Sequence, residues 1–206
     1  YKEGKWVTVH IDDRLPCDRN GTLVFARCGD PNETWVPLIE KAYAKLHGSY
    51  HSLEGGKAMD GIVDLTGGVA IGEQEIDSSL CNEDFWNELT EKLHRGCFMM
   101  GVSLSEKKEE LAEEKGLLSA HQYTILSCTQ TKTGYRLLKI RNPWGHREWN
   151  GRWSDGSKEW TPKTIEEVGA TFGDDGTFYM CFEDFCSIWS VMDTVKIFND
   201  PHDSLR

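Results

Sequence analysis

The pattern of apolar and polar residues predicts a strand near the start of the chain. Every second residue of the segment 5–12 is apolar, so these side chains fall on one face of an extended backbone. Turn-forming residues fill positions 13–21, and a short apolar run follows at residues 22–26. The two apolar segments are therefore predicted to pair as a β-hairpin.

A helical period comes next. Apolar residues recur at spacings of three and four over residues 35–46, which predicts a helix with one apolar face. Asn32 or Thr34 is expected to cap its first turn, and Gly48 is expected to end it. A second helix with the same kind of stripe is predicted near residues 82–94.

Glycines cluster between residues 52 and 72, which predicts a loop-rich joint between two parts of the chain. The mixed-charge segment 105–115 is typical of a solvated helix or loop. A short amphipathic turn is expected at residues 182–189. The remaining apolar runs predict strands, so the pattern favours an α+β fold with two lobes. These strands are predicted at residues 97–104, 122–127, 135–141, 177–181 and 191–198.

Composition narrows the class of protein. The 206 residues carry 23 Lys and Arg against 34 Asp and Glu, a net charge of −11, which argues against a nucleic-acid or anionic-membrane surface. No apolar run is long enough to span a bilayer, so no stable membrane insertion is expected. The chain starts without Met or an apolar signal core, so we expect a piece of a longer protein. Seven cysteines without a CxxC pair favour reduced thiols and a cytoplasmic location.

Two polar segments flank the predicted strands 122–127 and 135–141. His121 lies just before the first strand and Asn142 just after the second. A hairpin would bring them together at one end of the sheet. An imidazole oriented by an amide oxygen is the base half of a thiol-protease triad. Pro143 favours an extended backbone at Asn142, and Trp144 could shield the His–Asn hydrogen bond from water. The residues alone also leave open a purely structural His and an ordinary Asn-Pro turn.

Longer motifs carry a resemblance to a known family. The chain resembles the calpain family of calcium-dependent cysteine proteases over nearly its whole length. The matching segments are Trp6–Pro16, Glu40–Leu46, Asp64–Gly68, Arg141–Gly145, Glu148–Asp155 and Asp174–Met180.

The resemblance implies an α+β, papain-like cysteine protease core. Residues 1–68 would form the end of the first, helical lobe. Residues 69–198 would form the second, antiparallel β-sheet lobe, and residues 199–206 would link to a following domain. His121 and Asn142 match the catalytic His and Asn of the family, and Trp144 matches its shielding Trp. Ala120 departs from the family, which usually has Gly before the His.

The nucleophile is missing from this match. In papain-type enzymes the catalytic Cys precedes the His by about 130–150 residues, which lies before residue 1 here. None of the seven cysteines is followed by Trp, as the family nucleophile is. The chain is therefore expected to supply two of the three triad members, with an upstream lobe as the partner that carries the Cys.

The family also implies calcium. In the second lobe the resemblance carries ligand roles to Glu148, Asp155, Asp175 and the backbone carbonyl of Gly173, and carboxylates and carbonyls are the oxygen ligands that Ca²⁺ takes. In the first lobe only Glu33 is retained. Thr177 stands where many relatives have an acidic ligand, which should weaken the second-lobe site. Solvated carboxylates are the alternative in so acidic a chain.

The predicted function is calcium-dependent, limited proteolysis of protein substrates inside the cell. Two other classes stay open. One is a non-catalytic calpain-like module that binds calcium or partners. The other is a papain-like acyl transferase, which would more often orient its His with Asp than with an Asn-Pro-Trp segment.

Overall fold

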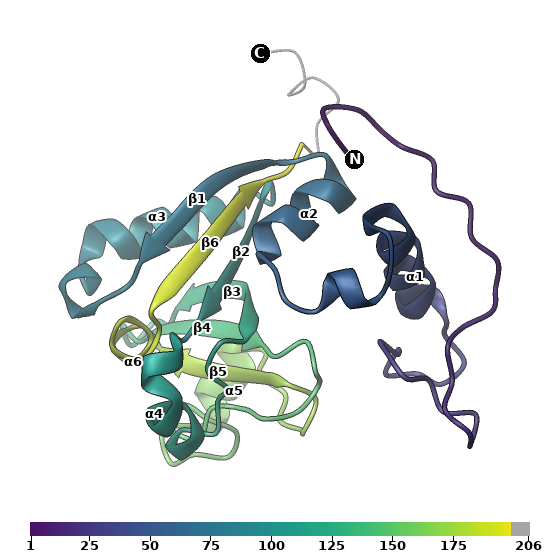
Figure 1. The fold of residues 1–206 in the computed structure, drawn as a ribbon. Coiled ribbons are helices and arrows are strands. Elements are labelled where there is room, and N and C mark those ends of the chain that lie inside the picture. Colours follow the sequence, from purple (N-terminus) through teal and green to yellow (C-terminus); the bar gives the residue numbers. More distant parts are fainter. Residues whose placement is uncertain (199–206) are drawn as a thin grey trace. The chain divides into compact units, whose positions relative to one another are not determined.

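The computed structural model describes residues 1–198 and divides into two compact units, residues 1–57 and a second unit that begins at residue 58. The second unit contains a six-stranded sheet in the order β1-β6-β2-β3-β4-β5 (Figure 1). Its strands are β1 (Val69–Glu75), β2 (Phe98–Ser103), β3 (Gln122–Gln130), β4 (Arg136–Arg141), β5 (Thr177–Cys181) and β6 (Val191–Lys196). Its α-helices are α2 (Ala58–Thr66), α3 (Glu83–His94), α4 (Glu109–Glu114), α5 (Pro162–Val168) and α6 (Phe182–Ile188), with short 3₁₀ turns η2 (Ser78–Leu80) and η3 (Glu106–Lys108).

The first unit contains helix α1 (Trp35–His47) and a 3₁₀ turn η1 (His51–Leu53). The predicted helix is confirmed, and Gly48 follows it with a positive φ of 105°. Thr34 occupies the N-cap position, but its side chain makes no capping hydrogen bond. The prediction of a side-chain cap from Asn32 or Thr34 is therefore wrong, although Thr34 does occupy the N-cap position.

The predicted hairpin of residues 5–12 and 22–26 is wrong. Neither segment forms a strand, and the ladder between residues 13 and 26 is reduced to a bridge between Cys17 and Leu23. Lysines of α1 bind the backbone carbonyls of the first segment instead: Lys45 donates to the carbonyl of His10 (2.6 Å) and Lys41 to that of Asp12 (3.2 Å). Most of the segment is also exposed, so water can satisfy its other backbone groups and no partner strand is needed.

The segment 52–72 contains the division between the two units, after residue 57, as the predicted joint requires, but it is not mostly loop, because it contains α2 and the start of β1. Two of its glycines, Gly67 and Gly68, separate α2 from β1. Gly67 follows α2 with a positive φ of 68°, the conformation that helix ends take most easily with glycine. A Cβ at Gly68 would lie 2.6 Å from the carbonyl oxygen of Lys196, so only glycine lets the chain pass this close to β6.

Adjacent strands of the sheet all pair antiparallel, as the α+β prediction requires. The predicted hairpin of β3 and β4 is confirmed, with Thr124 opposite Arg141 at its open end. A one-residue irregularity between Ile125 and Ser127 shifts the register along β3. The pairing puts the residue before β3 and the residue after β4 at the same end of these two strands.

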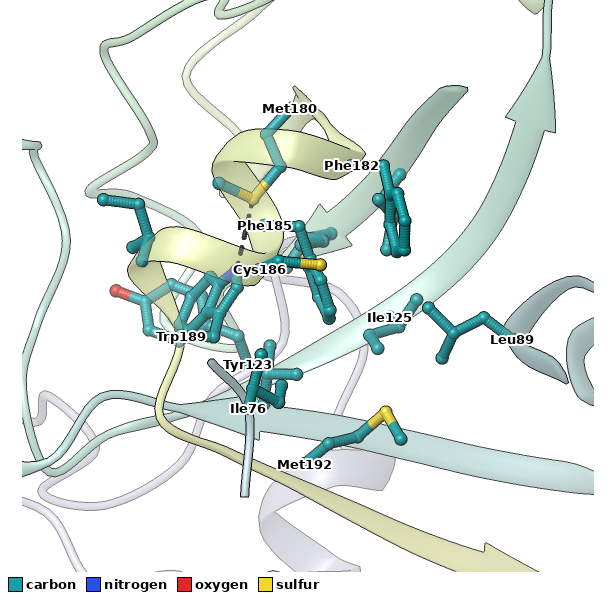
Figure 2. Packing of buried hydrophobic residues seen from close by; sticks show 14 of the residues in the cluster. Ile76, Leu89, Tyr123, Ile125, Met180, Phe182, Phe185, Cys186, Trp189 and Met192 are labelled. Carbon is teal, nitrogen blue, oxygen red and sulfur yellow. Dashed lines mark hydrogen bonds between the residues drawn. The ribbon is translucent and has the colours of Figure 1, made fainter. Parts of the chain in front are cut away.

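One face of the sheet carries the main core. Side chains of α3 and α6 pack there with the inward residues of the strands. Figure 2 shows Trp189 against Tyr123, with its indole N–H directed at the sulfur of Met180 at 3.2 Å. The largest fully buried side chains are Trp86, Trp189, Tyr123, Phe178, Phe182 and Phe185, and at about 25 cal/mol per Å² of apolar area each contributes more than a smaller aliphatic side chain of the same core.

The opposite face of β4 and β5 is covered as well. A smaller cluster joins Leu137, Tyr179 and Cys181 to the tryptophans Trp153 and Trp160. Helix α5 closes this cluster, and sequence analysis missed it. Its signals were present: Thr161 caps Thr164, Pro162 occupies the first turn, and Gly169 ends the helix in the left-handed region.

Other predicted elements are confirmed. The second helix, the buried strand at residues 97–104 and the later strands appear with ends no more than three residues from the predicted ones. The segment 105–115 is helical, and Ala112 of α4 is fully buried. Within residues 1–198 no helix has the length and apolar character needed to cross a membrane. The domain boundary at residue 68 stays a prediction, and the linker predicted at residues 199–206 lies outside the described residues.

Candidate functional site

His121 lies directly before β3, at the open end of the β3–β4 hairpin. The preceding residue, Ala120, has a φ of 48° and donates its N–H to the carbonyl of Leu104 at 2.9 Å. This left-handed backbone is one that glycine adopts without strain. The geometry therefore explains why a Gly is expected before the His, and why Ala120 is accommodated at some cost.

Asn142 follows the last residue of β4 and is fully buried. Its Oδ1 lies 2.8 Å from Nε2 of His121. The contact predicted from the hairpin is confirmed, although the two residues are 21 positions apart in the chain.

Every polar atom of the Asn142 side chain is bonded. Nδ2 donates to the carbonyls of His146 (2.7 Å) and Arg147 (3.1 Å), while Oδ1 also accepts from the N–H of Trp144 (3.0 Å). Since two carbonyls require the amide nitrogen, the oxygen must face His121, and the ring nitrogen Nε2 must donate. The neutral imidazole therefore carries its proton on Nε2, and Nδ1 is the nitrogen able to accept a proton.

Two aromatic rings enclose His121. The ring of Trp144 lies 4.5 Å from the imidazole between centroids, and the ring of Tyr123 meets it edge-on at 5.1 Å. The Tyr123 hydroxyl accepts from the N–H of Leu118 at 2.9 Å, which ties the loop before β3 to the core. Burial lowers the pKa of His121, and the hydrogen bond to Asn142 opposes this by favouring the protonated ring.

A second polar site lies further along the same loop. Glu148 accepts through Oε1 from the N–H groups of Asp175 (3.1 Å) and Gly176 (2.7 Å). Asp155 accepts through Oδ2 from the N–H of Gly173 at 2.8 Å. We call Glu148, Asp155 and residues 173–177 the acidic loop site. The two acidic segments predicted to approach each other do so.

The surroundings of the acidic loop site disfavour the ionised form of its carboxylates. Desolvation raises the pKa of both Glu148 and Asp155; the negative charge of Asp155 adds to the effect at Glu148, and that of Asp175 adds to it at Asp155. Oδ1 of Asp155 is buried and has no hydrogen-bond partner. Two converging carboxylates, one with an orphaned oxygen, fit a hard cation.

The remaining predicted ligands are placed less tightly. Asp175 uses Oδ1 to accept from the N–H of Thr177 at 2.8 Å, and Thr177 itself carries no charge. Glu33 belongs to the first unit, where its Oε2 accepts from the indole of Trp35 at 3.1 Å. Among residues 1–198 no three His, Cys, Asp or Glu side chains converge as a metal cluster. A cation at the acidic loop site would therefore need backbone oxygens as well as carboxylates.

All seven cysteines are free thiols. Burial raises the pKa of Cys128, Cys181 and Cys186 to about 12, so these three stay protonated at neutral pH. Inert buried thiols of this kind are structural rather than nucleophilic.

Comparison with known proteins places the chain in a family. A family model described as "Calpain family cysteine protease" matches residues 1–196. The chain belongs to the calpain family. It is 42% identical to calpain-9 of Rattus norvegicus over the whole chain and 30% of that protein. It is 39% identical to calpain-B of Drosophila melanogaster over the whole chain and 23% of that protein.

Plant relatives match as well. The calpain-type cysteine protease DEK1 of Arabidopsis thaliana is 39% identical over 89% of this chain and 9% of its own length. The chain thus spans about 30% or less of these three curated relatives. It has the mixed helices and antiparallel sheet of a papain-like α+β cysteine protease domain.

Sequence analysis missed several groups that hold the Asn142 site and the acidic loop site together. The carbonyls of His146 and Arg147 and the peptide of Gly176 give no signal of their own in a sequence, because every residue has a backbone. Of these residues only Gly176 could have been noticed in the sequence, because a glycine stands there between two acidic residues and a predicted strand.

Proposed function

We propose that this chain supplies the His–Asn part of the active site of a calpain-type cysteine endopeptidase. The observation that carries the proposal is the 2.8 Å contact of His121 Nε2 with an Asn142 amide whose other partners determine its orientation. That contact leaves Nδ1 as the ring nitrogen available to a thiol, which is the arrangement that a Cys–His–Asn triad requires.

The chemistry then follows in two stages. Nδ1 of His121 takes the proton of the nucleophilic thiol, and the thiolate attacks the carbonyl carbon of a peptide bond. As the C–N bond breaks and a thioester forms, His121 gives that proton to the leaving amine. Water, deprotonated by the same nitrogen, hydrolyses the thioester and restores the thiol. Asn142 holds the ring throughout, and Trp144 keeps water from the His–Asn hydrogen bond.

The nucleophile is proposed to lie outside this chain, in an upstream lobe of a longer protein. None of the seven cysteines has the sequence context of the family nucleophile. Three of them have thiols with a pKa of about 12, whereas an activated thiol needs a depressed pKa. The upstream lobe is thus the first partner of this chain, and protein substrates are the second.

Calcium is the proposed cofactor. Glu148, Asp155, Asp175 and the carbonyl of Gly173 would hold it in the acidic loop site, and Glu33 would contribute to a separate site in the first lobe. Bound calcium supplies a positive charge that offsets the repulsion between these carboxylates. The raised pKa of Glu148 and Asp155 and the orphaned Oδ1 of Asp155 support this assignment. Calcium-dependent cleavage in the cytoplasm is the activity we propose for the whole protein.

A direct test compares the 206-residue chain with the longer protein that includes the upstream Cys. The chain alone should not hydrolyse a fluorogenic peptide, with or without calcium, and should take up no covalent thiol-protease inhibitor. The longer protein should cleave in the presence of calcium and lose that activity in EGTA. Cleavage by the chain alone that His121→Ala abolishes would overturn the placement of the nucleophile.

The same experiment separates the second candidate, a non-catalytic calpain-like module. The absence of a nucleophile context around every cysteine of this chain is what keeps that candidate open. A longer protein that binds calcium but neither cleaves peptides nor reacts with the inhibitor would support the module and refute the protease.

A further inference from the structure

The peptide groups of Gly176 connect the acidic loop site to Asn142. The N–H of Gly176 donates to Oε1 of Glu148 at 2.7 Å, and its carbonyl accepts from the N–H of Asn142, also at 2.7 Å. Both bonds are at the short end of the range for N–H···O contacts. One residue therefore bonds to the proposed calcium ligand on one side and to the proposed catalytic Asn on the other.

Close packing leaves no freedom at this position. Gly176 is buried and has a φ of 83°, in the left-handed region. A Cβ there would lie 2.6 Å from the carbonyl oxygen of Asn142 and 2.8 Å from Cα of Gly145. Both neighbours are backbone atoms, so they cannot move aside as the end of a flexible side chain could.

A second connection runs through the chain itself. Nδ2 of Asn142 donates to the carbonyl of Arg147, the residue before Glu148. Arg147 has a φ of 61°, a conformation that non-glycine residues adopt only when their surroundings hold them there. Glu148 is thus tied to the Asn142 side chain through Arg147 and to the Asn142 backbone through Gly176. The two connections form a closed ring of bonds.

We propose that Gly176 is a positioning residue for the Asn142–His121 pair, and that the Glu148 carboxylate holds Gly176 in place. Neither residue touches the imidazole; both act on it through Asn142. The inference rests on the proposed function, in which His121 and Asn142 are the catalytic pair. It gives Glu148 a role in the metal-free chain, in addition to its proposed role as a calcium ligand.

The test measures the pKa of His121 by NMR in the 206-residue chain, in EGTA so that no metal contributes. Asn142→Ala provides the reference shift, because it removes the hydrogen bond that raises the pKa of His121. Gly176→Ala should move the pKa in the same direction by roughly half of the reference shift or more, and should add little to Asn142→Ala in the double variant. Such non-additivity is expected only if Gly176 acts through Asn142.

Gly176→Ala can fail to fold, so Glu148 variants provide an independent route. Glu148→Leu removes the acceptor of the Gly176 N–H and should lower the pKa of His121. Glu148→Gln keeps an oxygen acceptor and should restore most of the wild-type value. Asp155→Leu is the matched control, since Asp155 holds Gly173 of the same loop and makes no bond to Gly176. It should leave the pKa of His121 unchanged.

The outcomes distinguish the two proposals. If Asn142→Ala shifts the pKa of His121 but neither folded Gly176→Ala nor Glu148→Leu does, the positioning role is refuted and the catalytic pair stands. Equal shifts from Glu148→Leu and Asp155→Leu would also refute it, since a general loosening of the loop would then suffice. If Asn142→Ala itself has no effect, the proposed His–Asn pair fails first.

Discussion

Two polar sites share the loop between β4 and α5, and the fold satisfies them to different degrees. At the first, all polar atoms of the Asn142 side chain have protein partners, although the residue is fully buried. At the second, Glu148 and Asp155 have raised pKa values, and one oxygen of Asp155 is buried without a partner. The protein alone completes the Asn142 site, whereas the acidic loop site calls for a proton or a cation from solvent. The Asn142 site therefore holds its geometry without a ligand, whereas the acidic loop site should change with pH or with a bound cation.

The largest effect should come from breaking the first site at its reacting atom. His121→Ala in the longer, Cys-containing protein should lower kcat/KM for a peptide by about 10³-fold, because general acid–base catalysis contributes about 10²–10⁴. Steady-state hydrolysis of a fluorogenic peptide measures this. His94→Ala, an exposed histidine of α3, is the control and should retain wild-type kcat/KM. Retention of activity in His121→Ala would remove His121 from the mechanism.

Asn142→Leu should destabilise the 206-residue chain by about 3 kcal/mol, because it leaves the carbonyls of His146 and Arg147 and the N–H of Trp144 without their partner. Urea unfolding followed by circular dichroism measures the loss. Asn150→Leu removes one exposed side-chain bond, to the carbonyl of Glu114, and should cost about 1 kcal/mol or less. Similar losses in both variants would show that the buried bonds of Asn142 contribute no more to stability than an exposed side-chain bond does.

Calcium should stabilise the acidic loop site, whose carboxylates lack a counter-charge, and not the Asn142 site, whose polar atoms already have partners. At 100 times its Kd, calcium should raise the free energy of unfolding of the chain at neutral pH by about 2.7 kcal/mol. Glu148→Gln should abolish the heat of binding in calorimetry, and Thr177→Glu should tighten binding by adding a carboxylate. Heat that is unchanged in Glu148→Gln would exclude Glu148 from the site.

In metal-free buffer the contribution of the acidic loop site to the stability of the chain should fall as the pH rises. The folded-state pKa values of Glu148 and Asp155 are raised above their ordinary values of 4.5 and 3.8. Their contribution to stability is therefore fully present below those values and is lost as the pH rises through the raised ones. Wild type should lose stability over this range relative to the double variant Glu148→Gln/Asp155→Asn. A parallel pH profile for the two proteins would contradict the prediction.

The smallest effect concerns the backbone that leads into His121. Ala120→Gly should stabilise the chain by about 0.5 kcal/mol, since relief of a left-handed alanine slightly exceeds the entropy that glycine adds to the unfolded chain. Ala112→Gly, in α4, should instead destabilise by about 1 kcal/mol or more, because its φ is helical and its methyl is buried. Thermal unfolding of both variants measures the two signs. Destabilisation by Ala120→Gly would show that the methyl makes a contact worth more than the strain.

Local patterns in the sequence were enough to predict the elements that frame the site. The apolar runs that became β2, β3 and β4 were found because strands buried in the centre of a sheet remain apolar whatever pairs with them. The contact of His121 and Asn142 followed from hairpin pairing alone, which is the most local form of long-range contact. The strand predicted from alternating apolar residues at 5–12 was wrong, because alternation defines one face of an extended segment but supplies no partner strand. Lysines of α1 bind carbonyls of this segment instead.

Residue types and their spacing along the chain were enough to establish the family, the pairing of β3 with β4 and the identity of the imidazole and its amide partner, because these depend on side-chain type and on neighbours along the chain. The folded chain was needed to show which carbonyls orient Asn142, that Gly176 joins it to Glu148, and that Asp155 has a buried oxygen without a partner. Those features are made by backbone groups and by desolvation. Backbone groups are the same in every residue, and desolvation depends on everything packed around a group, so neither can be located before the chain is folded.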